Sequence, residues 1–187
     1  PVCPPRCIPD SHLHNRTSVA AYLPPSKKIV LKEVVGPRTY HLCLMSADGS
    51  AGPAINFRWA AGDIACMAVH PVTGDIFAAE QLLFAKVFCR MHVFSPQCKL
   101  VSSFDIELPN DGKGADLGNL SSYHQRRPQD FCPSAMAIDP IHQEIYMTTR
   151  NDSRVVVFTI YGLYARHWGG TTDSAVLVSP AGVGLRY

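Results

Sequence analysis

The sequence predicts an all-β fold: a β-propeller of four-stranded blades, of which this chain holds a part. Three observations predict it: four short strands linked by tight turns within residues 131–168, an earlier copy of that pattern, and a length of only 187 residues. A four-stranded meander has two apolar faces, so it must stack against copies of itself. Because a closed ring needs at least about four blades of about forty residues each, we expect a partial propeller or a fragment of a longer chain.

The best-defined blade begins with a small, apolar strand over residues 134–138. This strand ends at Asp139 and Pro140, where the proline has no backbone N–H to continue a ladder. Asn, Asp, Ser and Gly mark the later turns, and the strands between them are rich in β-branched and aromatic residues. The remaining three strands are predicted over residues 144–148, 154–159 and 164–168.

The earlier copy lies about seventy residues upstream, and self-similarity within a sequence is the signature of repeat architectures. MAVHP at 67–71 lies over MAIDP at 136–140, and RMHVF at 90–94 lies over RVVVF at 154–158. His70 then takes the place of Asp139, which predicts a turn role for both. Phe104 falls where Trp168 falls, so the two aromatics are expected at equivalent positions in their outer strands.

This pattern resembles the NHL repeat, a propeller-blade motif with a Pro-x-Gly/Ala-hydrophobic-Ala-hydrophobic-Asp strand and an Arg-hydrophobic-hydrophobic-hydrophobic-Phe strand. Residues 131–168 fit it best and residues 63–104 fit it moderately. The chain departs from the motif at the end of the second strand, where Ala-Ala-Glu and Met-Thr-Thr replace the usual Val-Ala-Asp. The resemblance implies a propeller used as a rigid platform for partners. The departures indicate a divergent lineage.

Taken in chain order, the sequence begins with a Pro-rich extended leader over residues 1–28, in which one short strand is predicted over residues 18–23. A partial NHL-like propeller is predicted over residues 29–187, with a hairpin of strands 29–35 and 40–46 at its start. Its blades are predicted near 29–56, 57–105 and 131–169, and the next begins at 176. A long inter-blade loop spans residues 107–130.

The composition, with 47% hydrophobic and 17% charged residues, is that of a folded globular domain. A formal net charge of +2 without basic clusters disfavours nucleic-acid binding, and no apolar run reaches the roughly eighteen residues that span a bilayer. Seven cysteines cannot all pair within the chain. Cys43, Cys66 and Cys132 fall in strands and are expected as small buried thiols. An intracellular compartment is favoured.

Partner contacts are predicted first in the inter-blade loop, because a long loop without regular structure in a compact domain is usually functional or disordered. An expanded surface loop without a role is an equally good interpretation. The residues assigned to partner binding are Asn110, Lys113, Tyr123, His124, Arg126 and Arg127.

The search for chemistry gives no catalytic residue and no cofactor. The eight histidines share no metal-ligand spacing beyond His12-x-His14, which is a weak signal on its own. His92 is expected as a satisfied residue within a strand. Some propellers that resemble this one are lactonases or lyases that hold a metal in the central channel. The weak candidates for such ligands are Glu80, Asn151 and Asp152.

The sequence therefore favours a non-catalytic protein-interaction scaffold within a larger multiprotein complex, with WD40-like architecture and other proteins as partners. Two alternatives stay open. One is a metal-dependent propeller enzyme. The other is single-stranded RNA binding, which would need clustered Arg and Lys beside exposed aromatics.

Overall fold

The computed structural model describes the backbone of residues 20–23, 28–36, 39–46, 51–58, 62–82, 89–106, 133–149 and 154–169. Side chains are described for residues 64–81, 89–106, 133–149 and 154–169. These residues form twelve strands in three four-stranded antiparallel sheets, each a meander in which every strand pairs with its neighbour in sequence. The predicted all-β fold with four-stranded blades is confirmed.

The first sheet consists of β1 (Ala20–Leu23), β2 (Lys28–Gly36), β3 (Thr39–Ser46) and β4 (Ala51–Arg58). The predicted hairpin of the second and third strands is confirmed, since Val30 pairs with Leu44 across β2 and β3. β1 lies inside the stretch predicted as a leader, at the place of its one predicted short strand. It supplies the innermost strand of a four-stranded sheet, so this blade includes residues before 29, where the sequence pattern placed its start.

The second sheet consists of β5 (Gly62–Val69), β6 (Ile76–Leu82), β7 (Cys89–Phe94) and β8 (Leu100–Ile106). The third consists of β9 (Pro133–Asp139), β10 (Glu144–Thr149), β11 (Arg154–Thr159) and β12 (Tyr164–Gly169). All four strands predicted for this last blade are confirmed to within one residue at each end. The further blade predicted from 176 lies outside the described residues.

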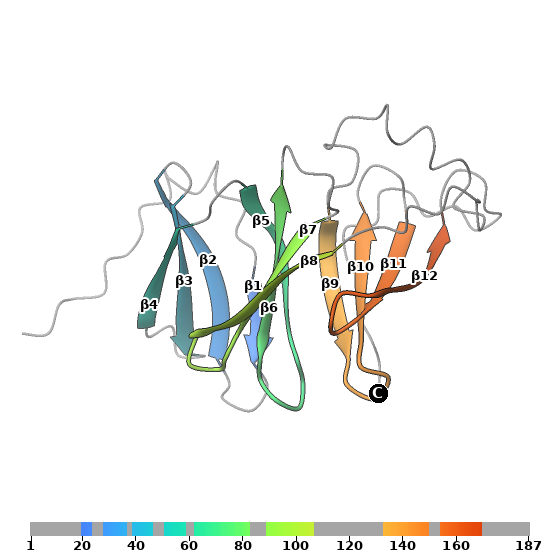
Figure 1. Cartoon of the computed structure of the whole chain (residues 1–187). Coiled ribbons are helices and arrows are strands. Elements are labelled where there is room, and N and C mark those ends of the chain that lie inside the picture. Colours follow the sequence, from blue (N-terminus) through green and yellow to red (C-terminus); the bar gives the residue numbers. More distant parts are fainter. Residues whose placement is uncertain are drawn as a thin grey trace, which may run out of the picture.

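The three sheets follow one another across the molecule (Figure 1). Their first strands are neighbours, with β1 in contact with β5 and β5 in contact with β9. This is the arrangement of propeller blades, in which the innermost strands surround a common axis and the sheets pack face to face.

One hydrophobic core joins the second and third sheets. The second sheet contributes Phe77, Ala79 and Met91, and the third contributes residues on the opposite side of the interface, among them Ile145, Met147, Val156 and Phe158. In each strand the residues of one parity enter this core because side chains alternate between the two faces of a sheet.

The hairpin turns between the third and fourth strands have the same backbone hydrogen bonds in both sheets. The Ser95 N–H donates to the Lys99 carbonyl over 2.8 Å, and the Thr159 N–H donates to the Leu163 carbonyl over 2.8 Å. The left-handed position is Cys98 (φ 60°) in one turn and Gly162 (φ 87°) in the other. A Cβ on Gly162 would lie 2.8 Å from the ring of Phe104, so the turn of the third sheet touches the outer strand of the second.

We expect Val156→Ala to lower the free energy of unfolding by about 1–3 kcal/mol, because Val156 lies in β11 with 4% of its surface exposed. Chemical denaturation followed by circular dichroism measures this change. The matched control is Val72→Ala, since Val72 is 73% exposed in a turn and should change stability little. Equal small effects of the two substitutions would contradict the burial of β11.

Candidate functional site

A cluster of four side chains lies on the face of the third sheet that points away from the core. It consists of Glu144, Tyr146, Arg166 and Trp168, and we call it the Arg166 patch. Strand pairing brings them together, because Tyr146 pairs with Val157 and Val157 pairs with Arg166. A β-bulge between Val157 and Phe158 keeps Arg166 and Trp168 on this face, while Tyr164 joins the core.

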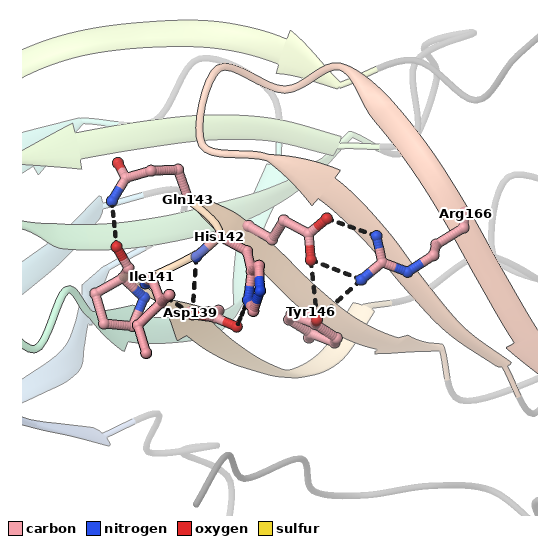
Figure 2. Close-up of polar contacts among 8 residues, drawn as sticks. Asp139, Ile141, His142, Gln143, Tyr146 and Arg166 are labelled. Carbon is pink, nitrogen blue, oxygen red and sulfur yellow. Dashed lines mark hydrogen bonds and ion pairs between the residues drawn. The ribbon is translucent and has the colours of Figure 1, made fainter. Parts of the chain in front are cut away.

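Polar contacts fix the guanidinium group of Arg166 (Figure 2). Its Nη1 donates to Glu144 Oε1 over 2.5 Å and its Nη2 donates to Glu144 Oε2 over 2.7 Å. The Tyr146 hydroxyl donates to Glu144 Oε2 over 2.9 Å and accepts from Arg166 Nη2 over 3.0 Å. A two-pronged arginine–carboxylate contact of this kind sets the orientation of the side chain as well as its position.

The charges of the patch reinforce one another. The Arg166 guanidinium lowers the pKa of Glu144, and the Glu144 carboxylate raises the pKa of Arg166. Burial, followed by the contact with Glu144, raises the pKa of Tyr146. The patch therefore keeps one fixed ion pair and a neutral phenol at neutral pH.

Aromatic stacking completes the patch. The rings of Tyr146 and Trp168 stack with centroids 5.9 Å apart and planes inclined by 16°, and the Arg166 guanidinium carbon lies 5.3 Å from the Trp168 centroid. Trp168 nonetheless remains 45% exposed. The side chains most enriched at the energetic centres of protein interfaces are Trp, Tyr and Arg. This face thus presents a rigid, amphipathic surface.

The turn beside the patch is closed by an acidic cap. Asp139 Oδ1 accepts the backbone N–H groups of Ile141 and His142 over 2.8 and 3.1 Å, and Asp139 Oδ2 lies 2.7 Å from His142 Nδ1. His70 closes the equivalent turn of the second sheet, because its Nδ1 accepts the backbone N–H groups of Val72 and Thr73. The turn role predicted for His70 and Asp139 is confirmed.

The stability of the Asp139 turn should depend on pH. His142 lowers the pKa of Asp139, so the contribution of the aspartate is present above about pH 4 and is lost as the pH falls through its folded pKa. Asp139 raises the pKa of His142, so its contribution is present below about pH 6.5 and is lost as the pH rises through its folded pKa. The contact is therefore strongest at mildly acid pH.

We expect the NMR titration midpoint of His142 to lie above the usual value of about 6.5 and to fall toward that value in Asp139→Asn. The ring is 69% exposed, so the effect on overall stability should be small. A midpoint unchanged by Asp139→Asn would contradict the contact. His167 lies in the same sheet and bonds to Tyr164, which makes it the internal reference.

Three hydrogen-bonded side chains, Glu80, His92 and Ser103, lie on the face of the second sheet that points away from the core. We call them the Glu80 network. His92 Nε2 lies 2.9 Å from Glu80 Oε2, and His92 Nδ1 lies 2.8 Å from Ser103 Oγ. Glu80 and His92 are 1% and 5% exposed. The Glu80 network links β6, β7 and β8, and hydrogen bonds are stronger in the low-dielectric interior of a protein than in water. His92 is therefore the satisfied strand residue that its sequence position predicted.

Most of the residues proposed from sequence fall outside the described part of the chain. This holds for the whole loop set, namely Asn110, Lys113, Tyr123, His124, Arg126 and Arg127, and for the weak metal candidates Asn151 and Asp152. The third metal candidate, Glu80, is described, and its carboxylate contacts His92. Within the described side chains, no group of three or more His, Cys, Asp or Glu residues is placed to hold a metal ion.

Three cysteines are described as buried thiols, namely Cys66, Cys89 and Cys98. This confirms the prediction for Cys66; the side chains of Cys43 and Cys132 are not described. Burial, and the neighbouring Cys66, raise the pKa of Cys89 well above its usual value. Its thiol is therefore protonated and unreactive at neutral pH. Among the described residues, no helix is long and apolar enough to cross a membrane.

Comparison with known proteins places this geometry among β-propellers. No family model matches the chain, and no curated protein does. Solved structures match at 12–16% identity. They include a chain of the nidogen/laminin complex (16% identity, TM-score 0.55), hydrazine synthase of Kuenenia stuttgartiensis (12%, 0.56) and the WD40 repeats of RRP9 (14%, 0.50). Likeness at this level shows the fold, and the chain is a partial β-propeller.

The matched regions cover most of this chain and about half of the others. The shares are 89% of this chain and 52% of the nidogen/laminin chain, 87% and 51% for hydrazine synthase, and 86% and 42% for RRP9. The chain thus spans about half the length of the propellers it matches.

Proposed function

We propose that this chain is a non-catalytic β-propeller platform that binds other proteins within a larger assembly. The observation that carries the proposal is the Arg166 patch, in which an exposed tryptophan, a tyrosine and an arginine are held in place by Glu144. A surface whose side chains are already ordered loses little conformational entropy on binding. The matched structures include hydrazine synthase, an enzyme, so the proposal of a platform rests on the patch and not on the fold.

We further propose that the inter-blade loop contributes to the same function through Asn110, Lys113, Tyr123, His124, Arg126 and Arg127. The NHL-like repeat pattern supports a platform of the NHL type, in which loops and sheet faces project from a rigid scaffold. WD40 repeats, present in RRP9, are another propeller type with the same architecture. Other proteins are the partners this surface fits, because stacked aromatics and arginine suit protein interfaces.

The experiment is a quantitative comparison of co-purifying proteins for the wild-type chain and for Trp168→Ala. We expect at least one partner to be lost by about 30-fold, the effect of removing a central interface residue worth about 2 kcal/mol. The matched control is Tyr161→Ala, because Tyr161 is an aromatic residue of the same sheet that is 76% exposed in a turn. Identical partner profiles for the wild type and Trp168→Ala would overturn the proposed role of the patch.

A further inference from the structure

The Glu80 network has the order of groups that activates a serine hydroxyl. Ser103 Oγ lies 2.8 Å from His92 Nδ1, and His92 Nε2 lies 2.9 Å from Glu80 Oε2. The three side chains share one face because His92 pairs directly with Ser103, and Glu80 is two residues from the β6 partner of His92. Glu80 and His92 are buried and Ser103 is exposed. The serine end of the network is therefore the end that a small molecule in solution can reach.

The partners of the imidazole determine its tautomer. An ionised carboxylate can only accept hydrogen bonds, so the contact with Glu80 places the ring hydrogen on Nε2 of His92. In the neutral ring, Nδ1 then keeps its lone pair and accepts the hydroxyl hydrogen of Ser103. A base beside a hydroxyl, with a carboxylate that orients the base, is the arrangement that makes serine a nucleophile.

The strand register aligns the second and third sheets from their second to their fourth strands. Phe104 pairs with Met91 in the second sheet, and Trp168 pairs with Val155 in the third. These partners are equivalent in the repeat, so the predicted equivalence of the two aromatics is confirmed in the strand register. Each member of the Glu80 network can therefore be compared with its counterpart in the third sheet.

The third sheet lacks the Glu80 network. Its residues at the three equivalent positions are, in the same order, Thr149, Val156 and His167. Valine at the middle position leaves no imidazole between the other two side chains. The third sheet nevertheless forms the same four-stranded meander and shares its core with the second. The meander does not require these groups, which favours a chemical role for them in the second sheet.

A positive charge lies on the same face of the second sheet. Arg90 precedes His92 by two residues and pairs with Asp105, so it is a diagonal neighbour of Ser103 across β7 and β8. Diagonal neighbours in a sheet lie within reach of long side chains. Arg90 Nε and Nη2 donate to Asp105 over 2.6 and 3.2 Å, which fixes the guanidinium group. A fixed cation of this kind can stabilise the negative charge that develops on a reacting carbonyl oxygen.

We propose that Ser103 is a nucleophilic serine that takes an acyl group from a carboxylic ester. Ser103 Oγ bonds to the carbonyl carbon, its proton passes to His92 Nδ1, and the carbonyl electron pair moves onto the carbonyl oxygen. That pair then returns, the bond to the alcohol oxygen breaks, and His92 gives the proton to this oxygen. The products are an acyl ester of Ser103 and a free alcohol. Glu80 is a positioning residue, because it acts through the imidazole.

This reaction is separate from partner binding at the Arg166 patch. A single acylation modifies the protein and needs no turnover, so it is compatible with a non-catalytic platform. Ser103 lies on the face of the second sheet that points away from the core shared with the third. Acylation of Ser103 and partner binding through Trp168 can therefore be tested independently.

The test is acetylation of the purified chain by p-nitrophenyl acetate, with the modified residues located by peptide mass spectrometry. We expect Ser103 to be acetylated about 100-fold faster than Ser102 or more, because a positioned general base contributes about 10²–10⁴-fold. Ser102 is the matched control, since it is the adjacent exposed serine and pairs with Val93 instead of a histidine. Ser103→Ala should remove the fast phase of nitrophenolate release.

Equal rates of acetylation at Ser103 and Ser102 would overturn the proposal. An unchanged rate at Ser103 in His92→Gln, with the fold verified by circular dichroism, would overturn it as well; we expect a fall of about 100-fold or more. The comparison of the two serines uses the wild-type chain, so it decides the proposal even where a variant fails to fold.

Glu80→Gln tests the positioning role separately. The new amide can donate to Nε2 of His92, so we expect the ring hydrogen to move to Nδ1 and the rate of acetylation at Ser103 to fall by about 100-fold or more. The nitrogen chemical shifts of the His92 ring report the tautomer. A changed tautomer with an unchanged rate would show that His92 is not the base, and an unchanged tautomer with an unchanged rate would remove the role of Glu80.

Discussion

Replacing His92 with alanine should lower the free energy of unfolding by about 3 kcal/mol. His92 is 5% exposed, and its two ring nitrogens contact Glu80 and Ser103. Truncation removes the imidazole partner of a carboxylate that is only 1% exposed, and a broken buried pair costs more than a lost surface contact. It also leaves a cavity beside Phe94, whose ring lies 6.5 Å from the imidazole. Guanidinium denaturation of both proteins measures the difference.

The control for this prediction is Ser103→Ala, which removes the exposed member of the Glu80 network. Its cost should be about 1 kcal/mol or less, because the freed ring nitrogen lies near the surface of the sheet. His92→Gln keeps a side-chain donor within the strand and should recover part of the loss. If His92→Ala and Ser103→Ala shifted the unfolding midpoint equally, the buried contact with Glu80 would not stabilise the sheet.

Gly162→Ala should destabilise the protein by about 2–4 kcal/mol through two separate effects. The backbone at Gly162 has φ +87°, a conformation that costs an alanine about 1 kcal/mol. The new Cβ would lie 2.8 Å from two ring carbons of Phe104, so the two sheets must shift apart locally. Thermal and chemical unfolding measure the sum of the two effects.

A matched substitution separates these effects. Gly74 has φ +77°, and a Cβ there would lie 3.1 Å from Pro96 Cγ, so Gly74→Ala tests the backbone effect with a milder contact. The excess cost at Gly162 belongs to the contact between sheets. Phe104→Leu combined with Gly162→Ala should show coupling between the two positions, and strict additivity would mean that Phe104 does not press on the turn.

The repeat pattern predicted the third sheet well because its strand and turn signals are local. Asp139 and Pro140 end β9, and the glycine at 162 marks the last turn. β1 illustrates the limit of this approach. A four-residue strand beside prolines has little signal of its own, and it becomes the inner strand of a blade only through pairing with β2 and contact with β5.

The Arg166 patch could not be read from the sequence because it depends on strand register. Glu144 and Arg166 are 22 residues apart, and two strand pairings bring them together. Simple alternation would place Tyr164, Arg166 and Trp168 on one face. The bulge after Val157 sends Tyr164 to the core instead. The Glu80 network could not be predicted from the sequence for the same reason, because its three side chains come from three different strands.

If the outward face of the third sheet binds protein, Trp168 should be less accessible in the native particle than in the isolated chain. Hydroxyl-radical footprinting with mass spectrometry compares the oxidation of Trp168 in that particle with its oxidation in the isolated chain at high dilution. We predict strong protection of Trp168 in the particle and no change at Tyr161. Equal oxidation of Trp168 in both samples would show that this face is uncovered in the particle and that no protein binds there.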